Sequence, residues 1–198
     1  MDAVKRSLRR QLRQTMMALP TTTKQAGGRA IANHLMDVLD GLGGGPPVVA
    51  FFASTVDELD TRPLDSLLRS RGFGRAVPRI RAGGELMFHE VYVPVHDLPL
   101  DAHGIPTPPA TSTKVDLAEC GLVCVPGLGF DDDGGRIGYG RGYYDRALQG
   151  VPLARVIGLF LDEQRVERVP MFETDVRMPR LCTPARGVVV VDKGPPSR

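Results

Sequence analysis

The chain has 198 residues, of which 42% are hydrophobic and 24% are charged, and its formal net charge is +2. A chain of this length suits one domain with one core, and so small a net charge provides no overall field for binding nucleic acid. No apolar stretch approaches the roughly 20 residues that span a bilayer, and charges recur too often in residues 2–19 for a signal-peptide core.

The first forty residues predict two helices, at about 2–18 and 22–40. Pro20 separates them, and the threonine run 21–23 is able to cap the second helix. The glycine- and proline-rich stretch 41–47 is expected to end the second helix.

The first predicted helix is amphipathic and basic. Its apolar residues recur at steps of four, at Val4, Leu8, Leu12 and Met16. Lys5 and Arg9 are also four apart and so share a face, for which exposure to solvent is the default interpretation. A membrane or RNA role would require more net charge or interleaved aromatic residues. An Arg-rich transit peptide fits poorly, because the segment starts with an acid and has little serine.

The remainder of the chain alternates strands with helices. Strands are predicted at 48–52, 76–80, 86–93, 122–125, 154–161 and 187–191. Helices are predicted from 60 or 61 to about 71 and from about 142 to 149. A proline-rich connection is expected at 94–109. This alternation predicts an α/β fold with a largely parallel sheet. Ligands of such sheets bind beyond the carboxyl ends of the strands, where segments 53–61 and 125–146 lie. No repeat or convincing linker interrupts the chain, so residues 1–198 are expected to form a single domain.

The cysteines and histidines give no sign of a transition-metal site. The three cysteines are an odd number without a CxxC pair, which suits reduced thiols in a cytoplasm. Cys120 and Cys124 flank a predicted buried strand and are interpreted as small core residues. The four histidines are scattered, without metal-binding spacing.

Residues 125–146 carry the strongest chemical signal of the chain. Seven glycines fall within residues 127–142, with Arg136 and Arg141 between them. Glycine lets backbone N–H groups approach an anion, and arginine adds a planar charged fork that suits phosphate oxygens. Asp145 supplies a carboxylate that suits Mg²⁺. The segment therefore predicts a site for the phosphates of a nucleotide, expected at the N-terminus of the helix that follows.

The common nucleotide motifs are absent. The sequence has no GxxxxGK[ST], and the glycines at 138, 140 and 142 give GxGxG rather than GxGxxG. A flexible surface loop is the alternative, but such loops usually contain serine, asparagine and lysine. Asp131, Asp132 and Asp133 form a rival carboxylate cluster, although Asp132 and Asp133 are expected in a solvated turn before Gly134.

Several motifs together resemble one enzyme family. They are KRSLR at 5–9, FFASTVDELDT at 51–61, PGLGFD at 126–131 and RIGYGRGYYDR at 136–146, with weaker matches in VPRI, GIPTP, ERVP and CTP. In this order the chain resembles the 5-formyltetrahydrofolate cyclo-ligase family, also called methenyltetrahydrofolate synthetase. The similarity extends from about Lys5 to Thr183.

The resemblance implies a fold, an activity and a setting. The fold is a three-layer α/β sandwich of the NagB/RpiA/CoA-transferase-like type. The activity is the ATP- and Mg²⁺-dependent conversion of 5-formyltetrahydrofolate, with or without a polyglutamate tail, to 5,10-methenyltetrahydrofolate, ADP and phosphate. The protein is expected to be a cytoplasmic monomer without nucleic-acid or membrane partners.

The resemblance also implies roles for individual residues. ATP would contact Lys5, Arg9, Arg136, Ile137, Gly138, Tyr139, Gly140, Arg141, Gly142, Tyr143 and Tyr144. The folate would contact Arg9, Ala53, Glu58, Tyr139, Gly140, Arg141, Gly142 and Tyr143. Asp145 and Asp175 would bind Mg²⁺, although Thr174 stands where some relatives have a histidine.

The chemistry that follows is phosphoryl transfer and ring closure. By hypothesis, the formyl oxygen attacks the γ-phosphate, nitrogen-10 attacks the activated carbon, and phosphate leaves. Lys5, Arg136 and Tyr143 are the expected catalytic residues. Two alternatives stay open, a small-molecule kinase and a non-catalytic relative that binds nucleotide or RNA. The presence of Lys5, Glu58, Asp145 and Asp175 together favours the enzyme.

Overall fold

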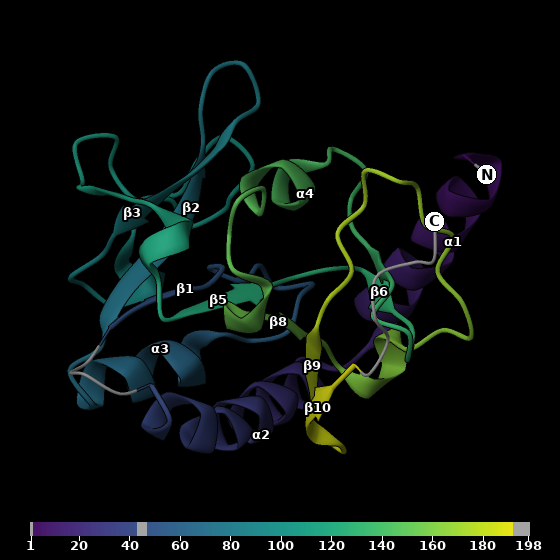
Figure 1. Cartoon of the computed structure of the whole chain (residues 1–198), viewed down its shortest axis with the longest axis horizontal. Helices are drawn as coiled ribbons and strands as arrows, with labels where there is room; N and C mark the ends of the chain where they lie inside the picture. The colour runs from purple at the N-terminus through teal and green to yellow at the C-terminus, as the bar shows by residue number, and fades with distance from the viewer. Residues whose placement is uncertain (1, 43–46, 192–198) are drawn as a thin grey trace.

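The computed structural model describes residues 2–42 and 47–191 (Figure 1). The α-helices are α1 (Asp2–Ala18), α2 (Thr21–Asp40), α3 (Arg62–Ser70) and α4 (Tyr143–Ala147). The strands are β1 (Val48–Ala50), β2 (Gly74–Ile80), β3 (Leu86–Glu90), β4 (Lys114–Val115), β5 (Leu122–Val125), β6 (Gly129–Phe130), β7 (Arg136–Ile137), β8 (Val156–Leu159), β9 (Arg180–Thr183) and β10 (Gly187–Val190). Short 3₁₀ helices lie at Val95–Asp97, Leu117–Glu119, Leu153–Arg155 and Asp162–Gln164.

The two N-terminal helices are confirmed, but the predicted threonine cap is wrong. Pro20 occupies the N-cap position of α2, and no side chain caps this helix. Proline suits this place because the chain before a helix is extended and Pro20 has a φ of −56° and a ψ of 143°. Part of the predicted break at 41–47 lies outside the described residues. Among the described residues, no helix is long and apolar enough to cross a membrane.

Eight strands form one mixed sheet in the order β10-β9-β8-β5-β1-β2-β3-β4. The five central strands, β9, β8, β5, β1 and β2, are parallel to one another. At the edges, β10 pairs antiparallel with β9, β3 pairs antiparallel with β2, and β4 pairs antiparallel with β3. The largely parallel α/β sheet is therefore confirmed. Strands β4, β9 and the small β6–β7 hairpin were not predicted, and the predicted strands 48–52, 86–93 and 154–161 are shorter in the structure.

Alternating residues divide the core between the two faces of the sheet. On β5, Leu122 and Cys124 pack with the side chains of α2 and α3, whereas Val123 and Val125 pack with Phe130 and Phe160 on the other face.

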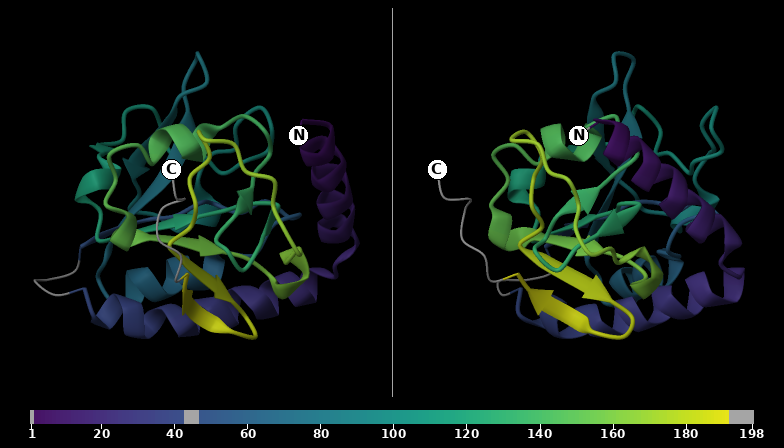
Figure 2. Two further views of the ribbon diagram at one scale, coloured as in Figure 1. Left: turned by 45° about the vertical axis from the view of Figure 1, so that its right-hand side comes forward. Right: turned by 90° about the vertical axis from the view of Figure 1, so that its right-hand side faces the viewer.

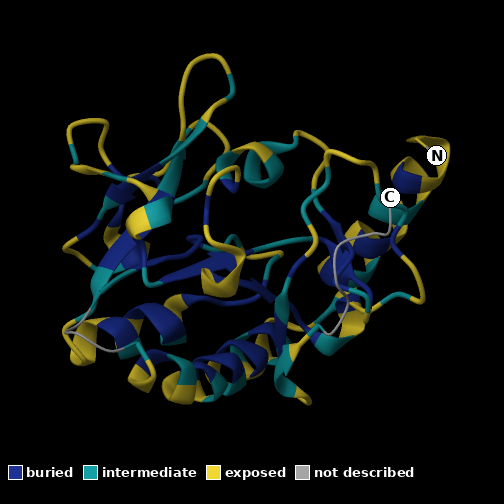
Figure 3. Cartoon of the chain, viewed as in Figure 1, coloured by how far each residue is buried: buried dark blue, intermediate teal, exposed yellow. Residues whose placement is uncertain are grey.

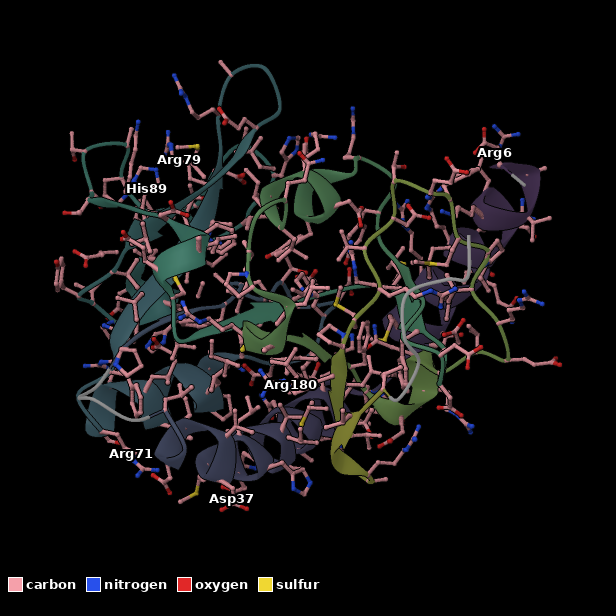
Figure 4. All side chains as sticks on the ribbon, viewed as in Figure 1. Arg6, Asp37, Arg71, Arg79, His89 and Arg180 are labelled. Carbon is pink, nitrogen blue, oxygen red and sulfur yellow. The ribbon has the colours of Figure 1, made fainter. Side chains whose placement is uncertain are left out.

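Helices α2 and α3 form one layer, and their inner sides are buried (Figure 3). Asp37 and Arg71 extend from the outer surface of this layer (Figure 4). The third layer contains α4, the β6–β7 hairpin and long connections (Figure 2).

The parallel strands bring distant segments to the same edge of the sheet. Strands β1, β5 and β8 are hydrogen-bonded neighbours, so the residues that follow them lie side by side. Segment 51–61 follows β1, and the glycine-rich segment follows β5. Helix α1 rises at a steep angle to α2, with its N-terminal end on the same side of the sheet as α4 (Figure 2). This edge is where the candidate site lies.

Candidate active site

A cavity of about 540 Å³ lies between α1, the segment after β1, the β2–β3 hairpin and the glycine-rich segment. Every residue with a role implied by the sequence lines it: Lys5, Arg9, Ala53, Glu58, Arg136, Ile137, Gly138, Tyr139, Gly140, Arg141, Gly142, Tyr143, Tyr144, Asp145 and Asp175. The expected site residues are therefore neighbours in space. Apolar residues that the sequence did not single out, among them Phe52, Ile80, Leu86 and Phe172, complete the walls.

Lys5 on α1 is buried rather than solvated, with 3% of its surface exposed. Its ammonium group forms an ion pair with Asp175 and lies 4.0 Å from the centre of the Phe172 ring. The Asp175 carboxylate also accepts a hydrogen bond from the Phe172 N–H at 2.6 Å. The default expectation of a solvated basic face is thus wrong for Lys5, whereas Val4, one residue before it, is 57% exposed.

Arg136 on β7 is the second buried cation of the cavity, with 7% of its surface exposed. Its Nη2 atom donates to Asp145 Oδ1 at 2.7 Å, and the same oxygen accepts from the Val176 N–H at 3.2 Å. Since Val176 directly follows Asp175, this bond brings the two predicted magnesium ligands together from segments thirty residues apart. The sequence spacing alone contains no signal for this pairing.

Two buried polar groups beside these ion pairs lack partners. Among the described residues, Arg136 Nε and the Tyr144 hydroxyl have no hydrogen-bond acceptor or donor within reach. Burial, with the nearby Glu58 charge second, raises the pKa of Tyr144, so its hydroxyl stays protonated. Unpaired buried donors are costly and therefore rare in native proteins. A phosphate group would supply the acceptors that these donors lack.

Arg9 holds the glycine-rich segment close to α1. Its Nε atom donates to the Gly138 carbonyl at 3.0 Å. Gly140 has a φ of +97°, and a Cβ there would lie 3.2 Å from Arg9 Cζ. Glycine is required at 140 both by this backbone conformation and by the close approach of the guanidinium.

Glu58 and Tyr139 connect two walls of the cavity. The Tyr139 hydroxyl donates to Glu58 Oε1 at 2.9 Å, and Glu58 Oε2 accepts from the Thr55 N–H at 2.9 Å. Burial of the hydroxyl end and the Glu58 charge raise the pKa of Tyr139, although the residue as a whole is 46% exposed. Tyr139 therefore remains a hydrogen-bond donor to this carboxylate over the physiological pH range.

The segment that carries Glu58 is fixed by α2. Lys24, 4% exposed, donates from Nζ to the Val56 carbonyl at 3.0 Å. The Thr61 hydroxyl closes the base of the segment by donating to the Phe52 carbonyl at 2.8 Å. Sequence reasoning did not assign a role to Lys24, and no residue pattern around it indicates that it is buried.

The residues of the cavity fit a magnesium ion that is shared with phosphates. The described residues contain no group of three or more histidine, cysteine, aspartate or glutamate side chains suited to holding a metal alone. Asp145 and Asp175 would provide two ligands, and Mg²⁺ commonly takes one or two carboxylates together with phosphate oxygens and water. The two aspartates therefore suit a metal that arrives with a nucleotide.

The rival carboxylates at 131–133 lie outside the cavity. The buried Asp131 accepts backbone N–H groups of Asp133, Gly135 and Val169 at 2.7–3.0 Å and so holds the β6–β7 turn together. Asp132 is at the surface, where hydrogen bonds from Arg165 and then Arg186 lower its pKa to about 2.

The helix after the glycine-rich segment is shorter than expected. Helix α4 covers Tyr143–Ala147 instead of about 142–149, and it begins after Gly142, whose φ is +62°. A helix of five residues has a weak dipole at its N-terminus. Anion binding would therefore depend on Lys5, Arg136 and the backbone of residues 138–142 rather than on the helix end.

Comparison with known proteins gives a consistent result. The 5-formyltetrahydrofolate cyclo-ligase family model matches residues 1–184. The 5-formyltetrahydrofolate cyclo-ligase of Escherichia coli K12 is 31% identical over 185 residues, which cover 88% of this chain and 97% of that protein. A probable 5-formyltetrahydrofolate cyclo-ligase of Schizosaccharomyces pombe is 29% identical, covering 65% of this chain and 70% of that protein.

Solved structures show the same fold. The NMR structure of Aquifex aeolicus 5,10-methenyltetrahydrofolate synthetase superposes with a TM-score of 0.74 at 24% identity, covering 98% of this chain and 96% of that chain. The 5,10-methenyltetrahydrofolate synthetase of Mycoplasma pneumoniae gives a TM-score of 0.72 at 20% identity, covering 91% of this chain and 98% of that chain.

Proposed function

The chain belongs to the 5-formyltetrahydrofolate cyclo-ligase family, and on this premise we propose that it converts 5-formyltetrahydrofolate to 5,10-methenyltetrahydrofolate with consumption of ATP. The observation that carries the proposal is the cavity itself. Two buried cations, two carboxylates and a glycine-rich backbone segment line one side of it. Glu58 and apolar side chains such as Ile80 and Leu86 are also part of the lining, which suits a flat heterocycle.

The ion pairs in the cavity suggest how a nucleotide would bind. Lys5 and Arg136 are each paired with a carboxylate, so the buried charges are balanced. Asp145 and Asp175 would hold Mg²⁺, which neutralises phosphate charge when bound. Lys5 and Arg136 would then bind phosphate oxygens, a role for which a point charge and a planar fork are both suited.

The residues of the chain would promote the reaction mainly by positioning and charge. A formamide oxygen is a weak nucleophile, so it must be held in line with the phosphorus that it attacks. Tyr143 would orient the formyl group or nitrogen-10, and Glu58 would accept hydrogen bonds from the N–H groups of the pterin. The formyl oxygen would displace ADP from the γ-phosphorus, and nitrogen-10 would then attack the formyl carbon, lose its proton and expel phosphate as the ring closes. The cations would stabilise the negative charge that develops.

The proposal includes the setting of the enzyme. We propose a single domain over residues 1–198 that acts as a cytoplasmic monomer, with ATP and a folate as its ligands and no nucleic-acid or membrane partner. One continuous sheet contains strands from β1, which begins at Val48, to β10, which ends at Val190, and this supports one domain. The three cysteines, all buried and free of disulfides, suit a reducing compartment.

The proposal is tested by the absorbance of methenyltetrahydrofolate in a mixture of protein, 5-formyltetrahydrofolate and Mg²⁺. We expect a rise that depends on ATP and disappears in Asp145→Ala, because this variant loses a magnesium ligand and the partner of Arg136. Asp132→Ala, which removes an exposed carboxylate outside the cavity, is the matched control and should keep the activity. A kinase would release ADP without the methenyl chromophore, and that outcome would overturn the proposal.

A further inference from the structure

Arg146 is an exposed residue that contacts two lining residues of the cavity and the neighbouring β2–β3 turn, without lining the cavity itself. Its Nη1 atom donates to the Arg141 carbonyl at 2.9 Å, and its Nη2 atom donates to the Gly84 carbonyl at 3.1 Å. The guanidinium also lies 5.7 Å from the centre of the Tyr143 ring. One side chain thus contacts the glycine-rich segment, the β2–β3 turn and the tyrosine expected to orient the formyl group.

The β2–β3 turn, residues 81–85, lies next to the lining of the cavity. Ile80 and Leu86 flank the turn and line the cavity, and the turn projects on the same side of the sheet as α4 (Figure 1). A Cβ atom at Gly84 would lie 3.7 Å from Tyr143 Cε1, so the turn passes directly beside the tyrosine ring. Within the described part of the chain, the Arg146 bond is the sole hydrogen bond between this turn and residues 138–147.

Arginine is well suited to this bridge, and the local backbone makes room for it. A planar guanidinium offers donors in two fixed directions, so it can serve two carbonyls at once, which the single ammonium of lysine does poorly. Gly142 has a φ of +62°, and a Cβ there would lie 3.0 Å from Arg146 Nη1. The glycine therefore allows the Arg146 side chain to fold back over the start of α4.

We propose that Arg146 is a positioning residue, which fixes Tyr143 and fastens the glycine-rich segment to the β2–β3 turn. The glycines at 138, 140 and 142 give this segment many conformations in the unfolded chain, so ordering the segment costs conformational entropy. Two hydrogen bonds and a ring contact from one side chain offset part of this cost. The inference rests on the proposed function, since Tyr143 has its role in that reaction.

The structure provides two matched controls for this role. Arg155 also donates from one guanidinium nitrogen to two backbone carbonyls, of Ala118 at 2.7 Å and Cys120 at 3.3 Å, but it lies away from the cavity lining. Arg81 lies in the β2–β3 turn itself and pairs with Glu85 at 3.7 Å, and within the described residues it forms no hydrogen bond or ion pair with residues 138–147. Arg155→Ala and Arg81→Ala show the effect of removing a surface arginine that does not link the glycine-rich segment to the β2–β3 turn. Any larger effect of Arg146→Ala is then due to the loss of this link.

The first measurement is steady-state kinetics of methenyltetrahydrofolate formation, with thermal unfolding beside it. A misplaced reacting group can cost up to about a hundredfold in rate. We expect Arg146→Ala to lower kcat about tenfold or more and to raise KM for both substrates, with a Tm no lower than that of Arg155→Ala. Arg146→Lys, which keeps the charge and one donor group, should regain part of the kcat. Kinetics equal to those of the two controls would overturn the proposal.

A second measurement is independent of activity. Trypsin cleavage after Arg141, followed by mass spectrometry, reports how firmly the glycine-rich segment is held. Arg146→Ala should be cleaved faster there than the wild type or Arg155→Ala. An unchanged cleavage rate would contradict the proposal that Arg146 holds the glycine-rich segment against the β2–β3 turn. If the wild type formed no methenyl product, the proposed function would fail while the cleavage result would still decide the role of the bridge. Faster cleavage in an Arg146→Ala enzyme with wild-type kinetics would overturn the positioning of Tyr143.

Discussion

Lys5 and Arg136 are the two buried cations of the cavity. Both are almost fully buried, and each forms an ion pair with one of the two carboxylates, Asp175 and Asp145. A buried pair of this kind contributes little net stability, because desolvation offsets the attraction. The two pairs are therefore better explained by the proposed binding, in which phosphate and Mg²⁺ would replace the internal partners.

At this scale, the most direct prediction concerns Arg136. Arg136→Ala should lower turnover at least a hundredfold, because one charge-stabilising donor in such a site lowers the activation barrier by roughly 2.7–4 kcal/mol. Tyr143→Ala should cause a loss of the same order. The measurement is kcat for methenyltetrahydrofolate formation at saturating ATP and folate.

The matched control for Arg136 is Arg165→Ala. Arg165 also pairs with an aspartate, Asp132, but both side chains are exposed and outside the cavity. This variant should keep near-wild-type turnover. If folded Arg136→Ala and Tyr143→Ala proteins both turned over at the wild-type rate, the assignment of the glycine-rich segment would be wrong.

The residues of the site differ in how far the sequence could predict them. The glycine-rich segment and Asp145 could be found from composition and spacing, because their chemistry is concentrated in one stretch. Asp175 required the family resemblance, and the burial of Lys5 contradicts the default for a basic helix. Both depend on contacts between segments far apart in the chain, which local patterns do not contain.

At the scale of elements, α2 is the support for the segment that carries Glu58. Gly27 and Gly28 let this helix approach closely, since a Cβ on Gly28 would lie 2.0 Å from the Asp60 carbonyl oxygen. The obstacle is backbone, so it can yield only if the helix and the segment move apart. The position of Glu58 thus depends on the spacing between α2 and residues 56–60.

We therefore expect Gly28→Ala to lower the free energy of unfolding by about 1–3 kcal/mol, as overpacking does. Gly41→Ala is the control, because its Cβ would lie 3.5 Å from the nearest atoms, in ordinary contact, and its φ is −75°. That variant should be neutral or stabilised by about 0.4–1 kcal/mol. Urea unfolding measures both, and equal stabilities of the two variants would contradict the close packing at Gly28.

The elements missed from the sequence share a physical cause. Strand β9 is four residues long and includes Arg180 and Thr183, and Pro184 follows it, so its apolar signal is weak. Its strand geometry comes from pairing with β8 and β10. Strands β6 and β7 have two residues each inside the glycine-rich stretch, where composition indicates loop. Long periodic segments such as α1 and α2 were predicted within about a residue, because their pattern is independent of tertiary partners.

At the scale of the whole molecule, the sheet separates two core clusters, and the three cysteines are buried in these clusters, between the sheet and the layers that cover its two faces. Burial, ahead of smaller electrostatic effects, raises the pKa of Cys120 to about 11 and that of Cys182 to about 12, and it raises the pKa of Cys124 further. The thiols are therefore protonated in the folded protein at pH 8. Because an unfolded thiol titrates near pH 8.5, their contribution to stability is present below that pH and is lost as the pH rises toward 11.

We expect the three thiols to be unreactive toward an aromatic disulfide reagent at pH 8 in the native protein and to react together when urea unfolds it. Reactivity in native conditions should rise only as the pH approaches 11. The measurement is the absorbance of the aromatic thiolate that the reagent releases, followed over time with and without urea. A cysteine that reacts at pH 8 as fast as a free thiol would contradict the core that the structure shows.

In the proposed function, one cavity brings a nucleotide and a folate together so that phosphoryl transfer is coupled to ring closure. The most direct test measures ADP and methenyltetrahydrofolate in the same reaction, with the wild-type protein, Mg²⁺, ATP and 5-formyltetrahydrofolate. We expect equal amounts of both products at every time, and neither product when the folate or ATP is omitted. ADP formed without methenyltetrahydrofolate, or the folate product formed without ADP, would contradict it.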